Sequence, residues 1–392
     1  MLIWLGLIVS LGTILLVARR NLPLALFCGA VILGFFTLPF FETFRIIAIT
    51  VSDISVLLLA LAMGLIPMIG GSMKDSGQMD DLVNNLRIGK RGLMAFSPAI
   101  MGLLPMPGGA LLSAPILEKG GIGVADDVKV AINNWFRHLF VMIYPLSSAL
   151  IASAKIANLN VYNAMFYLLP TFFFALFLGY VFLIRKIDGK IEYEEPFSVK
   201  GLVLPLGIVL IAPVLDFSLK TYVTLPFSEL ATVVGVGTAL ICSIMLSRVE
   251  LDLVNIAKKM KPWNFTLIII GMFIFLNIFK ASNAAALIGS IPLPPATLCV
   301  VAGFVLGLAT GRVLLPASII LPVYLTFGTI TPVLFALMYT GIFFGYMISP
   351  VHPCVGVSLE YFSVPMKNFF KLLLVPTLIV FSVVLLVSIF LV

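Results

Sequence analysis

The sequence predicts an all-α polytopic membrane protein with two inverted repeats, each of five transmembrane helices (one broken) plus one re-entrant helical hairpin. Three observations support this fold class. First, 61% of the 392 residues are hydrophobic and 10% are Asp, Glu, Lys or Arg, whereas soluble domains carry roughly 25% charged residues. Second, apolar runs close to the roughly 20 residues that a bilayer span needs recur along the chain. Third, helix-breaking residues interrupt such runs at corresponding places in the two halves.

The first repeat, residues 1–190, begins with three uninterrupted apolar runs. We predict spans at Leu2–Val17, Leu22–Phe40 and Ile54–Gly71. The first run has no basic segment before it and no polar cleavage segment after it, so we expect a retained helix rather than a secretory signal. A polar amphipathic stretch, Ser76–Arg91, separates these spans from the rest of the repeat.

The next apolar run, about residues 92–119, is predicted to be a re-entrant hairpin. Its centre, Pro105–Gly109, holds two Pro and two Gly within five residues, which precludes regular helix. Each half of the run is too short to cross a bilayer. The following helix, about 133–154, is broken at Pro145–Ser148, and Val161–Ile184 is a plain span.

The second repeat, residues 201–392, follows a cytoplasmic linker at 191–200 and has the same order of elements. Its elements are spans at Gly201–Leu219, Ser228–Met245 and Trp263–Phe279, a hairpin at about 296–321 interrupted at Thr310–Arg312, a helix at about 331–358 broken at Pro350 and Pro353, and a span at Met366–Val392. Adding 205 carries Ser113 onto Ser318 and Pro145 onto Pro350. A repeat with five crossings has inverted topology, and interrupted helices at matching positions of inverted repeats indicate a transporter's central site.

The distribution of basic residues tests this topology independently. If each hairpin returns to the side from which it enters, 18 of the 24 Lys and Arg residues lie on one face. The others are Arg45, Lys155, Lys220 and Lys280 on the opposite face, and Arg137 and Arg312 in the interrupted segments. The positive-inside rule assigns the first face to the cytoplasm. We therefore expect a multi-pass protein of a prokaryotic cell membrane with both termini outside, and the net charge of +7 does not indicate a nucleic-acid partner.

The four interruptions are candidates for one shared site, because non-helical backbone at membrane depth is tolerated only where it is buried in protein or lines a cavity. Half-helix N-termini there offer N–H groups to an anion, and freed carbonyls hold a cation such as sodium. Apart from Glu118, these segments contain no Asp or Glu. The residues at these breaks that offer carbonyls or hydroxyls are Pro105, Gly108, Gly109, Ser147, Ser148, Thr310, Gly311 and Ser349.

The polar side chains of these segments are cationic or neutral. The predicted substrate-binding residues are Arg312, His352, Ser113, Ser318, Arg137 and His138. An Arg at bilayer depth is costly and indicates function, and the fork of Arg312 suits a carboxylate or phosphate; the alternative is a structural role capping carbonyls. His352 binds substrate, carries a proton or satisfies freed backbone groups. For Arg137, the alternative is that its side chain snorkels to the cytoplasmic interface. For Ser113 and Ser318, the alternative is that the hydroxyl bonds the backbone of its own helix.

Sequence motifs exclude several other functions. The four cysteines, Cys28, Cys242, Cys299 and Cys354, lie in apolar runs without metal-ligand or redox spacing, so we expect buried, reduced packing residues. The chain has no HExxH, Walker A or GxSxG motif and no paired intramembrane aspartates. We expect a protein that is not an enzyme and that has no metal or cofactor beyond a sodium ion.

The order of elements and three strings resemble a known group. With LLPMPGGALLSAP (103–115), NNWFRH (133–138) and SPVHPC (349–354), the chain resembles the ion-transporter superfamily, which includes the divalent-anion:sodium symporters and the citrate, gluconate and arsenite permeases, and within it an uncharacterised prokaryotic integral-membrane family. The resemblance covers essentially the whole chain. It implies an elevator-type secondary transporter, often a homodimer. Carried over by position, it also implies two coupling-ion regions, one at Pro105–Gly109 with Ser147 and Ser148, and one at Thr310–Arg312 with Ser349–Pro353. The symporters' Ser-Asn-Thr signature is missing at all four breaks, so the resemblance does not extend to sodium coupling or dicarboxylate specificity.

The leading hypothesis is a secondary active transporter of a small organic or inorganic anion, coupled to sodium or protons. Its expected partners are the lipid bilayer, the anion and a second copy of the chain. Two alternatives remain open. One is an intramembrane lipid-modifying enzyme with His352 as base, and the other is a passive anion channel.

Overall fold

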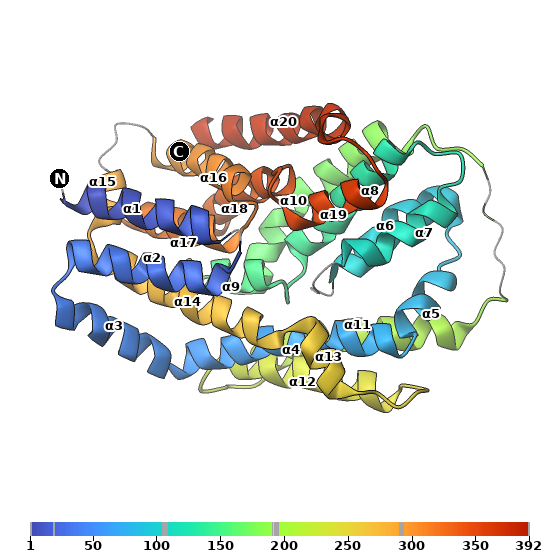
Figure 1. The fold of residues 1–392 in the computed structure, drawn as a ribbon, viewed down its shortest axis with the longest axis horizontal. Coiled ribbons are helices and arrows are strands. Elements are labelled where there is room, and N and C mark those ends of the chain that lie inside the picture. The colour runs from blue at the N-terminus through green and yellow to red at the C-terminus, as the bar shows by residue number, and fades with distance from the viewer. Residues whose placement is uncertain are drawn as a thin grey trace.

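The computed structural model describes residues 2–18, 20–103, 109–189, 191, 196–289 and 294–390. Over these residues the protein is helical and has no strand (Figure 1). The predicted all-helical class is therefore confirmed. The helices are described below with the bounds that the structure gives them.

The helices of the first half are α1 (Leu2–Val17), α2 (Leu22–Thr37), α3 (Phe40–Ser52), α4 (Ile54–Asp75), α5 (Gln78–Asn84), α6 (Gly89–Leu103), α7 (Ala110–Gly120), α8 (Asp126–Ile143), α9 (Ser148–Ile156) and α10 (Val161–Gly179), which continues as the π-helical turn η1 (Tyr180–Ile184). Those of the second half are α11 (Val199–Tyr222), α12 (Glu229–Met245), α13 (Leu253–Met260), α14 (Pro262–Ala281), α15 (Ala284–Gly289), α16 (Pro295–Thr310), α17 (Leu314–Leu325), α18 (Pro332–Met347), α19 (Pro353–Tyr361) and α20 (Met366–Phe390).

Several helices are suited to a bilayer. Within the described ranges, α4, α10 with η1, α11, α14 and α20 are each long and apolar enough to cross a membrane, and α8 with α9 forms a further span bent by 42°. Six more apolar helices, of 10–17 residues, are α1, α2, α12, α16, α17 and α18. Of these six, all but α17 expose large apolar side chains, which only a membrane or another apolar surface accommodates. The protein is a helical membrane protein.

The described helix breaks lie where Pro and Gly predict them. The chain leaves helix between Ile143 and Ser148, between Thr310 and Leu314, and between Met347 and Pro353. Pro lacks the N–H that continues a helix, and Gly lowers helix stability. The predicted first hairpin tip at 104–108 lies outside the described residues; the helices on either side of it are α6 and α7.

Three short helices were not predicted. The run predicted to end at Phe40 stops at Thr37, and α3 then begins at Phe40; the other two are α13 and α15. Charges at Glu42 and Arg45 make α3 resemble a loop in sequence, but its apolar face carries Phe40, Phe41 and Phe44, which are exposed. Such a helix forms because its apolar face meets lipid or protein rather than water.

Side-chain caps fix where several long helices begin. The carboxylate of Asp53 accepts hydrogen bonds from the backbone N–H groups of Ser55 (2.8 Å) and Val56 (3.3 Å) at the start of α4. Asn21, Asn160 and Thr331 cap α2, α10 and α18 in the same way. Each such cap satisfies a backbone donor that the first helical turn leaves free.

The described helices pack in two sets. In the peripheral set, α1 packs on α2, α11 on α12, α2 and α4 on α14, and α4 on α12, while α3, α5 and α13 pack on its members. In the central set, α6–α10 and α16–α20 pack on one another. In Figure 1, α20 lies along the top, α6, α7, α8 and α19 lie to the right, and α17 lies to the left below α1. The main contact between the sets is that of α14 with α17, and α15 also contacts α17. The central set contains the helix breaks.

Glycines bring α16 and α18 into backbone contact. A Cβ added to Gly345 would lie 2.1 Å from the carbonyl oxygen of Phe304, and one added to Gly307 would lie 2.3 Å from that of Ile342. Small residues at helix interfaces allow this close approach in membranes, where burial of apolar side chains does not drive association. The two helices therefore depend on these positions remaining glycine.

Gly345→Ala is expected to lower the free energy of unfolding by about 1–3 kcal/mol, the usual cost of overpacking. The added methyl group can be accommodated only if α18 moves away from α16. The matched control is Gly356→Ala in α19, where the added Cβ meets no atom within 4 Å. Thermal unfolding of the purified protein in detergent measures both changes. Equal Tm values for the two variants would contradict the close packing.

Candidate functional site

The two histidines of the chain meet at the centre of the central set. His138 lies on α8, and His352 lies in the break between α18 and α19. Their Nε2 atoms are 3.0 Å apart, and the ring centroids are 4.8 Å apart at 76°. The residues are 2% and 4% exposed, respectively. The site thus joins one helix from each half of the chain.

Hydrogen bonding defines the tautomers of a neutral histidine pair. Nδ1 of His138 is 2.5 Å from the carbonyl oxygen of Asn134, so this nitrogen is the donor. Its Nε2 then accepts from Nε2–H of His352, which leaves Nδ1 of His352 as an acceptor. That atom is buried and has no hydrogen-bond partner in the described part of the chain. A backbone group of Gly311 also interacts with the His352 ring.

Tyr346 and the tip of the second hairpin cover His352. The Tyr346 ring stands edge-on to His352, with centroids 4.3 Å apart, and to His138, with centroids 5.4 Å apart. Gly311 ends α16 in the left-handed conformation, with φ 59°, and a Cβ there would lie 2.9 Å from the backbone nitrogen of His352. A side chain at position 311 would therefore be strained and would collide with the histidine backbone.

Arg312 follows this glycine and is half-buried. Its backbone N–H donates to Oγ1 of Thr310 (3.3 Å). Its guanidinium acts electrostatically on Tyr346 and Cys354, but it forms no hydrogen bond or ion pair to any described residue. A half-buried guanidinium without an acid beside it is available for an anion.

Arg137 is held differently. Its Nη1 donates to the carbonyl oxygen of Gly109 (2.9 Å) at the start of α7, and the residue is 5% exposed. A Cβ on Gly102 of α6 would lie 2.5 Å from the carbonyl oxygen of Arg137, so α6 packs directly on this part of α8. The side chain is therefore buried against the start of α7. Its charge also acts on His138 and His352.

The two predicted serines have structural partners. Ser113 Oγ lies 2.6 Å from Asn133 Oδ1, to which it donates. Asn133 Nδ2 donates to the carbonyl oxygen of Ala110 (3.1 Å) and to Ser358 Oγ (3.0 Å), so this group ties the first hairpin to α8 and α19. Ser318 Oγ donates to its own helix at Leu315 (2.7 Å). Neither hydroxyl forms a hydrogen bond with His138 or His352.

Two of the predicted coupling-ion hydroxyls are hydrogen-bonded to backbone carbonyls. Ser349 Oγ donates to the carbonyl oxygen of Leu308 (2.6 Å), and Thr310 Oγ1 donates to that of Leu306 (2.7 Å). The Gly109 carbonyl already accepts from an arginine. The hydroxyls of Ser147 and Ser148, at the α8–α9 break, form no hydrogen bond with the described chain. Pro105 and Gly108 lie outside the described residues.

Three members of this site, Tyr346, Asn134 and Cys354, were not predicted from the sequence. Tyr346 contacts both histidines, and Asn134 orients His138. The side-chain donor atoms of His138, His352 and Cys354 all lie within 4.8 Å of one another. The prediction of four buried cysteines is wrong for Cys28, Cys242 and Cys354, which are partly exposed, although all four are reduced. The close spacing of His and Cys in SPVHPC is the signal that identifies Cys354 in hindsight.

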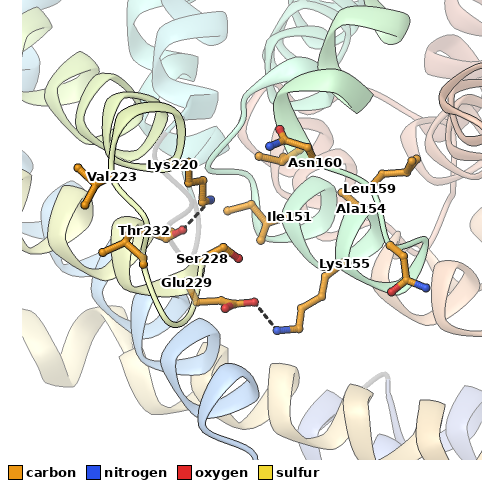
Figure 2. Close-up of a pocket in the computed structure, with 13 residues that line it drawn as sticks. Ile151, Ala154, Lys155, Leu159, Asn160, Lys220, Val223, Ser228, Glu229 and Thr232 are labelled. Atoms are coloured by element: carbon orange, nitrogen blue, oxygen red, sulfur yellow. Dashed lines mark hydrogen bonds and ion pairs between the residues drawn. The ribbon is translucent and has the colours of Figure 1, made fainter.

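A cavity of about 410 Å³ lies between α9–α10 and α11–α12, as Figure 2 shows. Its polar lining consists of Lys155, Asn158, Asn160, Lys220, Ser228, Glu229 and Thr232. Lys155 forms an ion pair with Glu229 and a hydrogen bond with Ser55. Because α9 belongs to the central set and α4 and α12 to the peripheral set, this lysine links the two sets.

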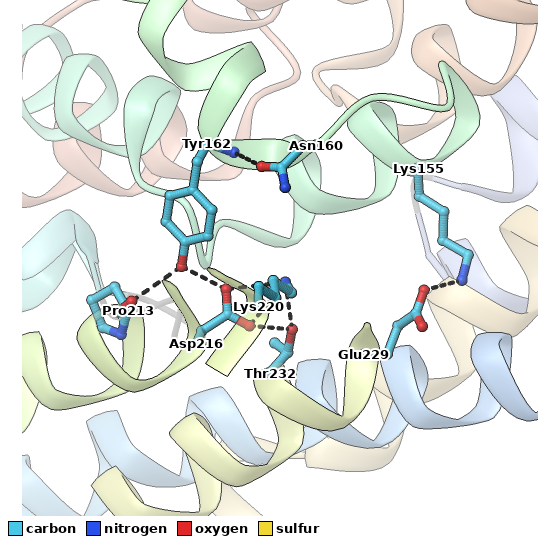
Figure 3. Close-up of polar contacts among 8 residues, drawn as sticks. All are labelled: Lys155, Asn160, Tyr162, Pro213, Asp216, Lys220, Glu229 and Thr232. Atoms are coloured by element: carbon cyan, nitrogen blue, oxygen red, sulfur yellow. Dashed lines mark hydrogen bonds and ion pairs between the residues drawn. The ribbon is translucent and has the colours of Figure 1, made fainter. Parts of the chain in front are cut away.

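A second polar cluster beside the cavity centres on Asp216 of α11 (Figure 3). The carboxylate, 0% exposed, is 2.8 Å from Nζ of Lys220 and accepts hydrogen bonds from Thr232 Oγ1 (2.7 Å) and Tyr162 OH (2.5 Å). Tyr162, on α10, provides another link from the central to the peripheral set. Because each lysine here has a carboxylate partner, the cavity lacks the uncompensated positive charge found at Arg312.

One protein-family model matches nearly the whole chain. A family model described as "Protein of unknown function (DUF401)" matches residues 2–392. No curated protein matches the sequence. The features of the protein that bear on its function are the histidine–arginine centre and the packing of the two helix sets.

Proposed function

The chain belongs to the DUF401 family of proteins of unknown function, and we propose that it is a secondary active transporter of a small anion. The observation that carries this proposal is the half-buried Arg312 guanidinium, which has no partner among the described residues and acts electrostatically on buried His352. Buried charges are ordinarily paired. An anionic substrate supplies the missing partner.

The proposed architecture has two inverted repeats, residues 1–190 and 201–392. Support comes from helix packing, in which contacts of the first half have counterparts in the second. Thus α6 packs on α8 as α16 packs on α18, α8 packs on α20 as α18 packs on α10, and α7 packs on α19 as α17 packs on α9. Transporters with inverted repeats hold substrate at the interface of the repeats, where His138 and His352 meet.

The proposed mechanism is elevator-type alternating access. The central set carries the hairpins, the broken helices and the anion, and it moves against the peripheral set. Packing within each set is more extensive than packing between them, as a moving unit requires. The links from Lys155 to Glu229 and from Tyr162 to Asp216 stabilise one position of the central set. A second copy of the chain is the proposed partner, held through the peripheral set.

Transport is coupled to sodium or protons in this proposal. If the coupling ion is sodium, we place it at the α8–α9 break. The hydroxyls of Ser147 and Ser148 have no hydrogen-bond partner in the described chain, whereas those of Thr310 and Ser349 already donate to backbone carbonyls. Imposing each ion gradient separately distinguishes the two couplings.

Flux measurements on proteoliposomes test the proposed function. Purified protein is reconstituted, and uptake of carboxylates, sugar acids and phosphonates is followed under sodium and proton gradients. Accumulation above equilibrium is expected for one class of anion. Flux that only equilibrates indicates a channel, and absence of flux for every compound contradicts the proposal.

A further inference from the structure

The contact between the two histidines includes a third potential metal ligand. The donor atoms of His138, His352 and Cys354 lie within 4.8 Å of one another. Nitrogen ligands bind metals at about 2.0–2.1 Å and sulfur ligands at about 2.3 Å. With one sulfur in the set, two ligands of one ion are therefore at most about 4.4 Å apart. A small rotation of the side chains closes the remaining gap. The three residues come from α8 and from the start of α19.

The histidines are already oriented as metal ligands are. Nδ1–H of His138 donates to the carbonyl oxygen of Asn134, which directs the lone pair of Nε2 toward His352. Metal-bound histidines usually have such a backbone partner on the other ring nitrogen. Nδ1 of His352 is buried and has no hydrogen-bond partner among the described residues. One ring nitrogen of the histidine pair therefore accepts no hydrogen bond from a described residue.

The surrounding charge selects the kind of ion. Arg137 and Arg312 both act electrostatically on His352, and the described cluster contains no carboxylate. A divalent ion bound to one thiolate would leave a net positive charge beside two guanidiniums. A monovalent ion bound to one thiolate is neutral. Thiolate and imidazole ligands together suit soft ions such as Cu(I).

We propose that His138, His352 and Cys354 bind one soft monovalent metal ion of the Cu(I) class. Binding replaces the hydrogen bond between the two histidines with two metal–nitrogen bonds and adds one metal–sulfur bond. The Nε2 proton of His352 moves to Nδ1 of the same ring, and the thiol proton of Cys354 passes to solvent. No oxidation or reduction takes place when the ion is supplied as Cu(I). An occupied site joins α8 to α19 and so links the two halves of the chain. The inference goes beyond anion transport and holds or fails independently of it.

Competitive titration tests the site directly. The purified full-length protein, in detergent and under anaerobic reducing conditions, is titrated with Cu(I) held by a chromophoric chelator. We expect one ion per chain, competition by Ag(I), and much weaker binding of Zn(II). X-ray absorption should show one sulfur and two nitrogen ligands.

Substitutions assign the ligands. Cys354→Ser should weaken binding by more than about 100-fold, since losing an outer-shell partner alone costs up to that much. Cys242→Ser is the matched control, because Cys242 is also partly exposed but lies on α12; its binding should equal that of the wild type. His352→Asn provides a second test if the first variant does not fold.

Either of two results overturns the proposal: no stoichiometric Cu(I) binding by the wild type, or unchanged binding in both Cys354→Ser and His352→Asn. Anion uptake by metal-free protein is measured in parallel. Uptake without Cu(I) binding rejects only the metal site, and Cu(I) binding without uptake of any anion rejects only the proposed transport function.

Discussion

Arg312→Ala is expected to abolish anion uptake while leaving the protein folded. The guanidinium has no partner among the described residues, so truncation leaves no buried acid unpaired. Hydrogen bonds to charged groups contribute about 1.5–3 kcal/mol each, and a bidentate pair contributes more than one of them. Loss of the fork therefore lowers anion affinity by two orders of magnitude or more, at little cost in stability.

Three measurements separate substrate binding by Arg312 from a structural role. Uptake is compared among the wild type, Arg312→Ala and Arg312→Lys, where lysine keeps the charge but not the fork and should recover part of the activity. Arg248→Ala is the control, because the Arg248 side chain is 71% exposed. Thermal unfolding in detergent checks folding. Wild-type uptake by Arg312→Ala would show that the residue does not bind the anion.

Asp216→Asn is expected to lower the free energy of unfolding by about 3–5 kcal/mol, the cost of breaking one side of a buried ion pair. The carboxylate is fully buried and Lys220 is 13% exposed, so the substitution leaves the ammonium group without its counter-charge. The new amide also presents donors to Lys220, Thr232 or Tyr162, each of which donates to the carboxylate in the native protein.

A double-mutant cycle isolates this pair. Lys220→Met added to Asp216→Asn removes the uncompensated charge and should recover much of the lost stability, because a buried pair replaced by uncharged groups is often close to neutral. Unfolding is followed by titration with a denaturing detergent. The control is Glu42→Gln, since the Glu42–Arg45 pair is exposed and is expected to contribute less than about 1 kcal/mol. Additive effects in the cycle would contradict a direct Asp216–Lys220 interaction.

Composition and local chemistry predicted the helical membrane class and the described helix breaks. At these breaks Pro350 and Pro353 lack amide protons, and Gly311 takes up a left-handed conformation; both are properties of the residue itself. The amphipathic helix α3 was missed, because charged residues at its start resemble a loop when the neighbouring apolar surface is not known. Cys354 was predicted to be a packing residue because the sequence does not show that His138 lies near it in space.

The sequence alone determined that the chain is apolar enough for a membrane and where Pro and Gly end its helices, because these properties depend on single residues and short runs. Only the tertiary structure decided which polar groups meet. His138 and His352 are 214 residues apart, Arg137 reaches Gly109 across a helix interface, and Asp216 gathers Tyr162 and Thr232 from two other helices. Such contacts depend on how helices pack and rotate against one another, which the periodicity of one helix does not specify.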